Sequence, residues 1–410
     1  MKKVYYGWWI VLASFLVALY VAGTTFYGFT AFIQPLTTEF GWSYSQISIA
    51  ASLRGLEMGL LAPFVGILAD RLGPRKLLVS GAIVLGSGII LLGLIQSLHM
   101  YYGAFILIAF GAGGCTSVVT MTVVANWFDR NVGKAMGITG SGFGAGGLLI
   151  PFIIAMIAAF GWRITLIVLG IGVWIIVIPA AMIMRNKDSR DIEEPTGTSS
   201  EISFSACSRK AAVRKFQYKD LMKTKSFLLI NFAEFIRLMV LMAVVTHIMP
   251  YLESLDISRH NAGLIAAAVP VLSIIGRFGF GWLGDLFDKK YVIALSYSMM
   301  GIGMLALCYA DLINMIYLFL FFFSIGFGGV AVLRGAFLRE FYGKYNFGKL
   351  LRIMMGFGAC GGIIGPTMAG YVFDKTGSYY SIWLAFSVFI VLSIVFVMRI
   401  ESKVKGLGCN

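Results

Sequence analysis

Long apolar stretches recur along almost the whole chain and are separated by short clusters of charged residues, glycines and prolines. A stretch of about twenty apolar residues is long enough for a helix to cross the roughly 30 Å hydrocarbon core of a bilayer. The stretches are continuous rather than alternating in polarity, which favours helices over the strands of a membrane barrel. The pattern therefore predicts an all-α integral membrane protein with about twelve transmembrane helices.

Turn and charge signals place these helices in two sets. The first set is expected at residues 7–33, 44–68, 76–97, 99–126, 132–159 and 162–184, and the second at 226–250, 260–284, 290–309, 312–338, 348–373 and 379–399. The first stretch is too long for a signal-peptide core and lacks a cleavage site, so we expect a retained helix. The one long polar segment, between the two sets, cannot bury enough apolar surface to order itself. We expect an N-terminal six-helix bundle at 1–184, a cytoplasmic linker at 185–225, a C-terminal six-helix bundle at 226–399 and a cytoplasmic tail at 400–410.

Composition supports a membrane environment and gives an orientation in it. Hydrophobic residues make up 59% of the chain and charged residues only 13%, whereas about a quarter of a soluble domain is charged. In the loops of one side the only basic residues are Arg163, Arg259 and Lys375, and nearly all the others lie on the side of the termini and the linker. Because Lys and Arg are retained in the cytoplasm, both termini and the linker are expected there. The net charge of +14 then reflects the excess of basic residues on the cytoplasmic side, and we expect no nucleic-acid partner.

An internal repeat relates the two sets of helices. The sequence Gly-Ile-Leu-Ala-Asp-Arg-Leu-Gly-Pro-Arg-Lys at 66–76 is answered 215 residues later by Gly-Trp-Leu-Gly-Asp-Leu-Phe-Asp-Lys-Lys at 281–290. The same offset relates Pro151 to Pro366, with glycine-rich sequence before each proline. Two homologous halves in parallel arrangement are typical of a secondary transporter whose halves rock against each other.

The loop at 66–76 resembles the major facilitator superfamily, and the resemblance covers the chain outside the linker. Within it, the sequence is most similar to the monocarboxylate transporter family. Tyr6-Gly7-Trp8-Trp9 resembles that family's first-helix motif, and the segment 127–137 resembles its fifth-helix motif. The family's substrate arginine on helix eight matches Arg277. The oxalate/formate antiporters share much of this pattern and are the alternative.

The resemblance implies a fold of two six-helix bundles, alternating access, and transport of lactate or pyruvate with a proton. It also implies a bacterial plasma (inner) membrane protein that functions as a monomer. The sequence departs from the animal members at two positions: their first-helix lysine is matched by Tyr27, and their helix-eight aspartate by Ser273. The antiporters' lysine on helix eleven has no counterpart in 353–371, which argues against a small dicarboxylate that needs two cations.

Charged residues inside the expected helices are costly unless they are paired or functional. They are Arg54, Glu57, Glu234, Arg237, Arg277 and Arg334. Arg54 with Glu57, and Glu234 with Arg237, are one turn apart, so each couple can largely neutralise itself. Arg277 and Arg334 are left without a local acid. A low-dielectric cavity with surplus positive charge favours an anion, and guanidinium fits a carboxylate through parallel hydrogen bonds.

Arg277 is therefore expected to bind the substrate carboxylate, the alternative being an arginine that snorkels to the interface from its helix end. Arg334 lies nearer its helix end and is expected in a cytoplasmic gate, with snorkelling or substrate contact as alternatives. Tyr27 places a hydroxyl on the first helix, where it could meet a small polar ligand or serve packing. Phe143 and Phe357 are expected to surround the substrate's short carbon chain.

Three residues are candidates for proton coupling. His247 could carry a coupled proton and contact the substrate, because an unperturbed imidazole exchanges its proton near physiological pH. The alternative is a hydrogen-bonded structural histidine. Glu57 and Glu234 are rival acceptors, but the arginine one turn away favours the charged form of each. We therefore expect these two carboxylates in structural pairs or in latches between the bundles.

A separate group of charges is expected to latch the cytoplasmic end. Asp70 lies beside Arg71 and Arg75, and Asp285 occupies the equivalent place in the second half. Such a latch must break in each cycle, so its contribution should be small. The alternative is that these residues only set the topology.

The sequence carries no signal of a metal site, a cofactor or a catalytic centre. The five cysteines are scattered and odd in number, and the histidines lack metal-ligand spacing. The glycines at 140–145 loosely resemble a dinucleotide fingerprint, but no strand precedes them, and we expect them to permit close helix packing. We expect a transporter rather than an enzyme, with anion exchange as one alternative and a membrane sensor or scaffold as another.

Overall fold

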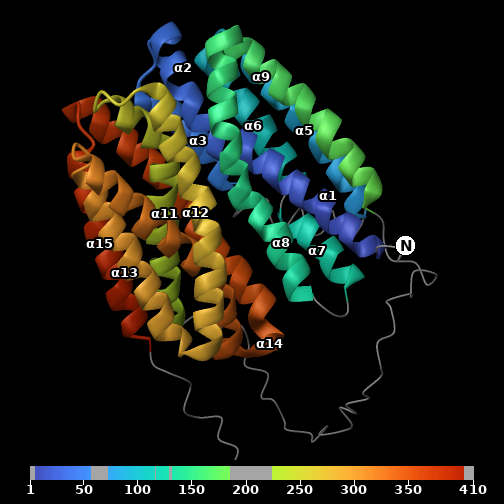
Figure 1. Cartoon of the computed structure of the whole chain (residues 1–410), viewed down its shortest axis with the longest axis vertical. Coiled ribbons are helices and arrows are strands. Elements are labelled where there is room, and N and C mark those ends of the chain that lie inside the picture. Colours follow the sequence, from blue (N-terminus) through green and yellow to red (C-terminus); the bar gives the residue numbers. More distant parts are fainter. Residues whose placement is uncertain (1–4, 57–72, 116, 129–131, 185–223, 401–410) are drawn as a thin grey trace, which may run out of the picture.

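The computed structural model describes residues 5–56, 73–115, 117–128, 132–184 and 224–400, and all regular structure in these residues is helical. The first half contains α1 (Tyr6–Val21), η1 (Ala22–Tyr27), η2 (Gly28–Phe32), α2 (Ile33–Phe40), α3 (Tyr44–Leu56), α5 (Pro74–Gly93), α6 (Leu98–Gly114), α7 (Ser117–Trp127), α8 (Val132–Ala145), η4 (Gly146–Leu148) and α9 (Leu149–Ile183). The second half contains α11 (Lys225–Glu253), α12 (Arg259–Leu286), α13 (Lys289–Cys308), α14 (Ile313–Thr376) and α15 (Tyr380–Met398). Figure 1 shows the blue-to-green elements of the first half packed beside the yellow-to-red elements of the second.

The helices begin and end where short polar or glycine signals interrupt the apolar pattern. The hydroxyls of Ser97, Thr224 and Ser258 accept hydrogen bonds from backbone N–H groups in the first turns of α6, α11 and α12. Such side chains satisfy donors that have no partner inside the helix. Gly41 and Gly377 end α2 and α14 in the left-handed conformation, which glycine adopts without strain.

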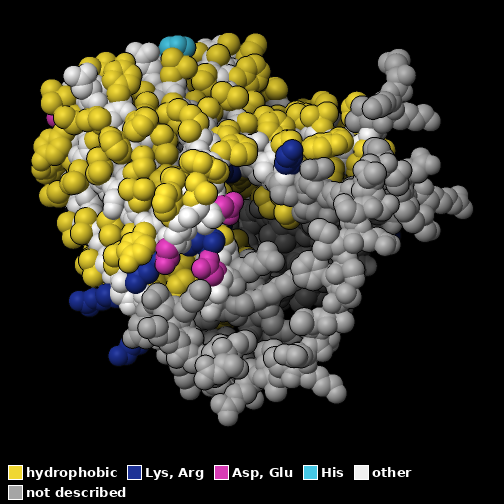
Figure 2. Space-filling model, turned by 60° about the horizontal axis from the view of Figure 1, so that its bottom comes forward, with side chains coloured by type: hydrophobic (Ala, Val, Ile, Leu, Met, Phe, Trp, Pro, Cys, Tyr) yellow, Lys and Arg dark blue, Asp and Glu magenta, His cyan; other side chains and the backbone are white. Residues whose placement is uncertain are grey.

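The outer surface of the bundle is apolar, as an environment of lipid requires. Ten helical stretches of the described residues are long and apolar enough to cross a bilayer. Large hydrophobic side chains such as Phe152, Ile175 and Trp282 are more than half exposed. Figure 2 shows hydrophobic side chains over most of the described surface, while the charged ones in this view gather toward the end turned to the viewer. The expectation of a multi-pass, all-α membrane protein is confirmed.

Two of the expected helix boundaries differ from the structure, and a third agrees with it. The first helix is not continuous, because a π-helical turn at Ala22–Tyr27 and a 3-10 segment at Gly28–Phe32 interrupt it. The boundary expected between 132–159 and 162–184 is confirmed, because non-helical backbone at Gly161, with φ of 79°, separates two helices within the element α9. The helices expected at 312–338 and 348–373 form one helical element, α14, because the sequence between them contains no proline to break it. The expected count of twelve spans stays a prediction.

The expected linker at 185–225 lies almost wholly outside the described residues, so the domain boundaries also stay a prediction. We call the end at which α1 begins and α15 ends the termini end, and the opposite end the distal end.

Glycines in the repeated segments permit close helix packing, as the sequence predicts. A Cβ on Gly146 would lie 2.7 Å from the backbone nitrogen of Gly23 in η1, next to α1. A Cβ on Gly361 would lie 2.1 Å from the carbonyl oxygen of Phe235 in α11. The two glycines are related by the 215-residue offset, so the repeat in the sequence corresponds to equivalent close contacts in the two halves.

Candidate functional site

Arg277 extends from α12 of the second half toward α8 of the first. Its Nη1 donates a hydrogen bond of 2.7 Å to the carbonyl oxygen of Gly140. Its guanidinium carbon lies 5.9 Å from the ring centroid of Phe143, a separation at which the cation is attracted to the ring face. Its Nε is buried and finds no hydrogen-bond partner among the described residues. The guanidinium therefore lies between the halves with unused donor capacity.

Tyr27 lies on the other side of Phe143. The two ring centroids are 5.4 Å apart, and Phe26 packs on both rings. Tyr27 is 1% exposed, and its hydroxyl has no hydrogen-bond partner in the described part of the chain. It is close enough to Arg277 for the two groups to interact electrostatically. The structure thus brings Arg277, Phe143 and Tyr27 together.

A small pocket between the halves adjoins this group. Tyr27 and Thr30 line it from the first helix, together with apolar side chains of α9, α11 and α12: Ile150, Val244, Val245, Ile248, Ala266, Val269 and Pro270. Pro270 is two turns before Arg277 on α12, which places the pocket on the distal side of the guanidinium. The expected wall residue Phe357 is 39% exposed on α14 and is not part of the Tyr27–Phe143 ring cluster.

The helix position one turn before Arg277 carries no acid. Ser273 occupies it, is fully buried, and donates its hydroxyl hydrogen to the carbonyl oxygen of Pro270 at 2.6 Å. A Cβ on Gly328 would come within 2.0 Å of the Ser273 carbonyl oxygen, so α14 packs tightly here. Ser273 therefore supplies no counter-ion for Arg277 from this position of α12.

His247 is fully buried in α11 and connects three elements. Its Nδ1 is 3.0 Å from the Tyr379 hydroxyl, and its Nε2 is 2.9 Å both from the Ser48 hydroxyl in α3 and from the carbonyl oxygen of Pro366 in α14. The carbonyl of Pro366 can only accept, so Nε2 carries the proton in this arrangement. His247 thus contributes to a hydrogen-bonded contact between the two halves.

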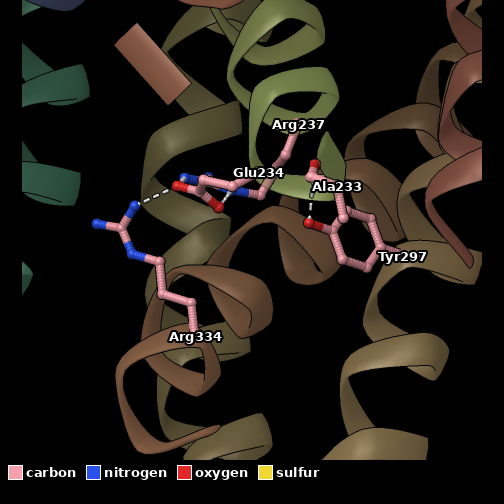
Figure 3. A network of polar contacts seen from close by, with 5 residues as sticks. All are labelled: Ala233, Glu234, Arg237, Tyr297 and Arg334. Carbon is pink, nitrogen blue, oxygen red and sulfur yellow. Dashed lines mark hydrogen bonds and ion pairs between the residues drawn. The ribbon is translucent and has the colours of Figure 1, made fainter. Parts of the chain in front are cut away.

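Glu234 is shared by two arginines, as Figure 3 shows. Its carboxylate accepts from Nε and Nη2 of Arg237 at 2.8 and 2.5 Å, and from Nη1 of Arg334 at 2.5 Å. The side chains of Glu234 and Arg237 are 2% exposed and that of Arg334 is 23% exposed. The expected pairing of Glu234 with Arg237 is confirmed. Arg334 has no neighbouring acid on its own helix, as expected, but it pairs with Glu234 of α11, a contact between helices that the sequence does not indicate.

The remaining expected site residues are Glu57 and the charges of the expected latch. Glu57, Asp70 and Arg71 lie outside the described residues. Arg75 at the start of α5 and Asp285 near the end of α12 are both exposed. The latch at the termini end therefore stays a prediction.

Sequence reasoning missed the partners of His247 and a set of contacts near the distal end. Ser48 and Tyr379 lie in ordinary apolar stretches, and no local pattern marks them. Asp374, which follows the second repeat of the proline-containing segment, contacts the start of α3. An acidic side chain directly after an expected helix, near the distal end, is the only sequence signal that could have drawn attention to it.

Comparisons with known proteins agree on the family. The model of the Major Facilitator Superfamily matches residues 13–257 and 227–407. Monocarboxylate transporter 12 of Mus musculus is 25% identical over 98% of this chain and 87% of its own length. The uncharacterized MFS-type transporter YcxA of Bacillus subtilis is 25% identical over 95% of this chain and 93% of its own.

Solved structures agree on the fold. A bacterial homolog of the human lysosomal transporter Spinster, in an inward-facing and occupied conformation, superposes with a TM-score of 0.75 at 15% identity and covers 97% of both chains. A point mutant of the nucleoside transporter NupG gives a TM-score of 0.74 at 13% identity over 97% of this chain and all of that one. At these identities the likeness concerns the fold alone.

Proposed function

Because this chain belongs to the major facilitator superfamily and is therefore a transporter rather than an enzyme, we propose that it carries small monocarboxylates such as lactate or pyruvate. The observation that supports this most is the guanidinium of Arg277, which lies between the halves and pairs with no acid of the described residues. A carboxylate would supply the missing negative charge through charge-assisted hydrogen bonds. The apolar pocket beside Tyr27 suits a short carbon chain better than a second charged group.

The transport cycle can be inferred from the hydrogen-bond partner that Arg277 has in this structure. The carbonyl of Gly140 holds the guanidinium from the opposite half. A substrate carboxylate would compete with this carbonyl, so binding would exchange a contact between the halves for a contact with the substrate. In our proposal the two bundles then rock about this site, with both termini on the cytoplasmic side of a bacterial plasma membrane and the monomer as the functional unit.

We propose symport with a proton, for which His247 is the first candidate. Protonation would turn its Nδ1 from an acceptor into a donor and would require the Tyr379 hydroxyl to reorient. That change would act on the contact that joins Ser48 to Pro366. Proton uptake could in this way be coupled to separation of the halves.

Arg334 and Glu234 form the proposed gate on the termini side of Arg277. One terminal nitrogen of Arg334 binds the carboxylate while the other points away from it in Figure 3. Glu234 also pairs with the buried Arg237, so its carboxylate would remain paired when Arg334 moves away. Release of Arg334 toward an entering anion is the motion that we assign to this gate.

Anion exchange is the second candidate, and the surroundings of Arg277 favour it specifically. Ser273 stands where a proton-accepting acid would be expected, and both nitrogens of His247 already have partners. An exchanger needs no titratable group at the site. After the first anion leaves, the Arg277 guanidinium would have to bind a second anion before the halves return to the original conformation.

The function can be tested by uptake of radiolabelled L-lactate into proteoliposomes with and without an inward proton gradient. Symport predicts accumulation that follows the gradient and collapses with a protonophore. Exchange predicts uptake that requires a preloaded anion and ignores the gradient. Absence of uptake under both conditions, with protein shown to be folded, would contradict lactate as a substrate.

Replacing Arg277 tests the centre of the proposal. Arg277→Ala is expected to abolish carboxylate uptake, and Arg277→Lys to reduce it at least about tenfold, because an ammonium cannot form the parallel pair of hydrogen bonds. Arg399→Ala is the control, since Arg399 is exposed beyond the end of α15. Unchanged uptake by Arg277→Ala would overturn the proposal.

A further inference from the structure

The start of α3 is capped by residues of both halves. The first N–H groups of a helix have no partner within it. The N–H of Gln46 donates to the Ser43 hydroxyl at 3.2 Å, and the N–H of Ser43 donates to the Gln46 side-chain oxygen at 3.0 Å. The N–H groups of Tyr44 and Ser45 instead donate to the two carboxylate oxygens of Asp374, at 3.0 and 2.9 Å. Asp374 belongs to α14, so the second half completes the cap of a helix in the first.

The backbone of α14 must come very close to α3 for this contact to form. Gly370 lies one turn before Asp374, and a Cβ there would be 2.9 Å from both the nitrogen of Ser45 and the carbonyl of Tyr44. A Cβ essentially never lies that close to another heavy atom, so only glycine permits the approach. Deeper in the same interface, the hydroxyls of Ser52 and Thr367 are 3.1 Å apart. We call the facing residues Tyr44, Ser45 and Ser52 of α3 and Thr367, Gly370 and Asp374 of α14 the distal seam.

We propose that Asp374 is a reversible latch that holds the distal end closed by capping α3 across the distal seam. A carboxylate is favoured at a helix N-terminus both by the unpaired N–H groups and by the helix dipole. When the seam parts, water can take over both the carboxylate and the two N–H groups, so the latch can open without leaving a buried polar group unpaired. The proposal requires only that the two halves separate during transport, whatever the substrate is.

The latch exists in only one of the two related interfaces. The repeat relates the start of α3 to the start of α12 at Arg259, and relates Asp374 to Ala159 of α9. Ala159 has no carboxylate to offer. The start of α12 is instead held by Arg259, which donates to the side-chain oxygen of Gln34 and to the carbonyl oxygen of Ala31. The two interfaces therefore close by different chemistry, and the distal seam can be weakened selectively.

The test uses the full chain with its five native cysteines replaced by alanine and one cysteine introduced as Ser52→Cys. Ser52 is 3% exposed in the closed seam. A membrane-impermeant maleimide added from the distal side reports how often the seam opens. Asp374→Ala is expected to raise the labelling rate roughly tenfold, which is the effect of losing charge-assisted hydrogen bonds. Asp311→Ala, at an exposed distal aspartate outside the seam, should leave the rate unchanged.

A second pair of variants tests the latch with the carboxylate intact. Gly370→Ala should also raise labelling, because its Cβ forces α14 away from α3. Gly356→Ala on the same helix is its control, since a Cβ there meets no atom within 4 Å. Faster labelling in Asp374→Ala and Gly370→Ala, with both controls unchanged, would support the latch. An unchanged rate in folded Asp374→Ala would overturn it, and if that variant does not fold, Asp374→Asn and Gly370→Ala decide in the same way. Because no substrate is used, the result does not depend on the proposed transport of monocarboxylates.

Discussion

Glu234 illustrates how a single acid determines the charge of the membrane interior. It lies between Arg237 and Arg334, so the three side chains together carry one net positive charge. Removing a partner from a buried ion pair is costly because the remaining charge stays out of water. The carboxylate is therefore needed for folding whether or not it also takes part in a gate.

This role predicts a large loss of stability on substitution of Glu234. Glu234→Gln is expected to lower the free energy of unfolding by about 3 kcal/mol, because it leaves Arg237 buried without an anion. Glu340→Gln is the control, since Glu340 pairs with Lys289 at a half-exposed position and such pairs contribute less than about 1 kcal/mol. Unfolding in mixed micelles by a denaturing detergent measures both. Equal losses would contradict the buried network.

At the scale of the element, glycine rather than polar chemistry determines how closely the helices approach. On α12, a Cβ at Gly276 would lie 2.0 Å from the carbonyl oxygen of Ile325 in α14, whereas a Cβ at Gly279 would meet nothing within 4 Å. One helix thus presents a packed glycine and an open one, three residues apart. The contact at Gly276 lies next to Arg277 and fixes the position from which the guanidinium extends.

Two substitutions on α12 distinguish the effect of close packing on stability from the effect of helix propensity. Gly276→Ala is expected to destabilise the protein by about 1–3 kcal/mol, because backbone atoms of α14 cannot yield to the added methyl group. Gly279→Ala should be neutral or stabilising by up to about 1 kcal/mol, since alanine favours the helix. Thermal unfolding in detergent, followed by the loss of monodisperse protein, compares the two. A similar loss in both variants would mean that α12 is not packed in this way.

At the scale of the whole molecule, the polar contacts that the described residues make between the halves lie from the middle of the bundle toward the distal end. Arg277 bonds to α8 in the middle, while the Thr30 hydroxyl donates to the Thr246 carbonyl oxygen and Asp374 caps α3 nearer the distal end. Contacts concentrated at one end allow the halves to pivot there. This arrangement suits alternating access, in which one end is closed at a time.

The same contacts should join the halves even when the chain is cut. Fragments 1–184 and 185–410, expressed together, are expected to co-purify through an affinity tag on either one. Introducing Asp374→Ala with Thr367→Ala into the second fragment should reduce the recovery of the first, because both residues belong to the distal seam. Fragments that are both present in the membrane but never recovered together would contradict the expected division at the linker.

The sequence predicts the fold well because lipid imposes a simple rule on it. Every backbone group must be paired internally, so length and hydropathy are enough to locate the helices. The boundary within α14 was not predictable, because Arg339, Glu340 and Lys344 indicate a loop but no proline breaks the helix there. Arg277 and the pair of Glu234 with Arg237 could be identified because charge in lipid is rare and neighbours on one helix face can be counted.

Contacts between distant segments could not be inferred in this way. The partners of Arg334 and His247, and the cap that Asp374 places on α3, join residues 100 or more positions apart. Periodicity determines which residues share a helix face but not which helix lies opposite. Tyr27 was identified only as a hydroxyl on the first helix. Its position beside Phe143 depends on the irregular winding of that helix, which no pattern in the sequence marks.

That irregular winding has a consequence for the geometry of the first helix. The hydroxyl of Thr25 bonds to the carbonyl oxygen of Val21 at the turn where the helix widens into the π-helical segment Ala22–Tyr27. A π turn holds about one residue more than an α turn, and each residue advances a helix by about 100°. Tightening this one turn would rotate everything after it and swing Thr30 away from Thr246. A small change of winding at Tyr27 would thus be transmitted to the distal end as a rotation of the residues that follow it.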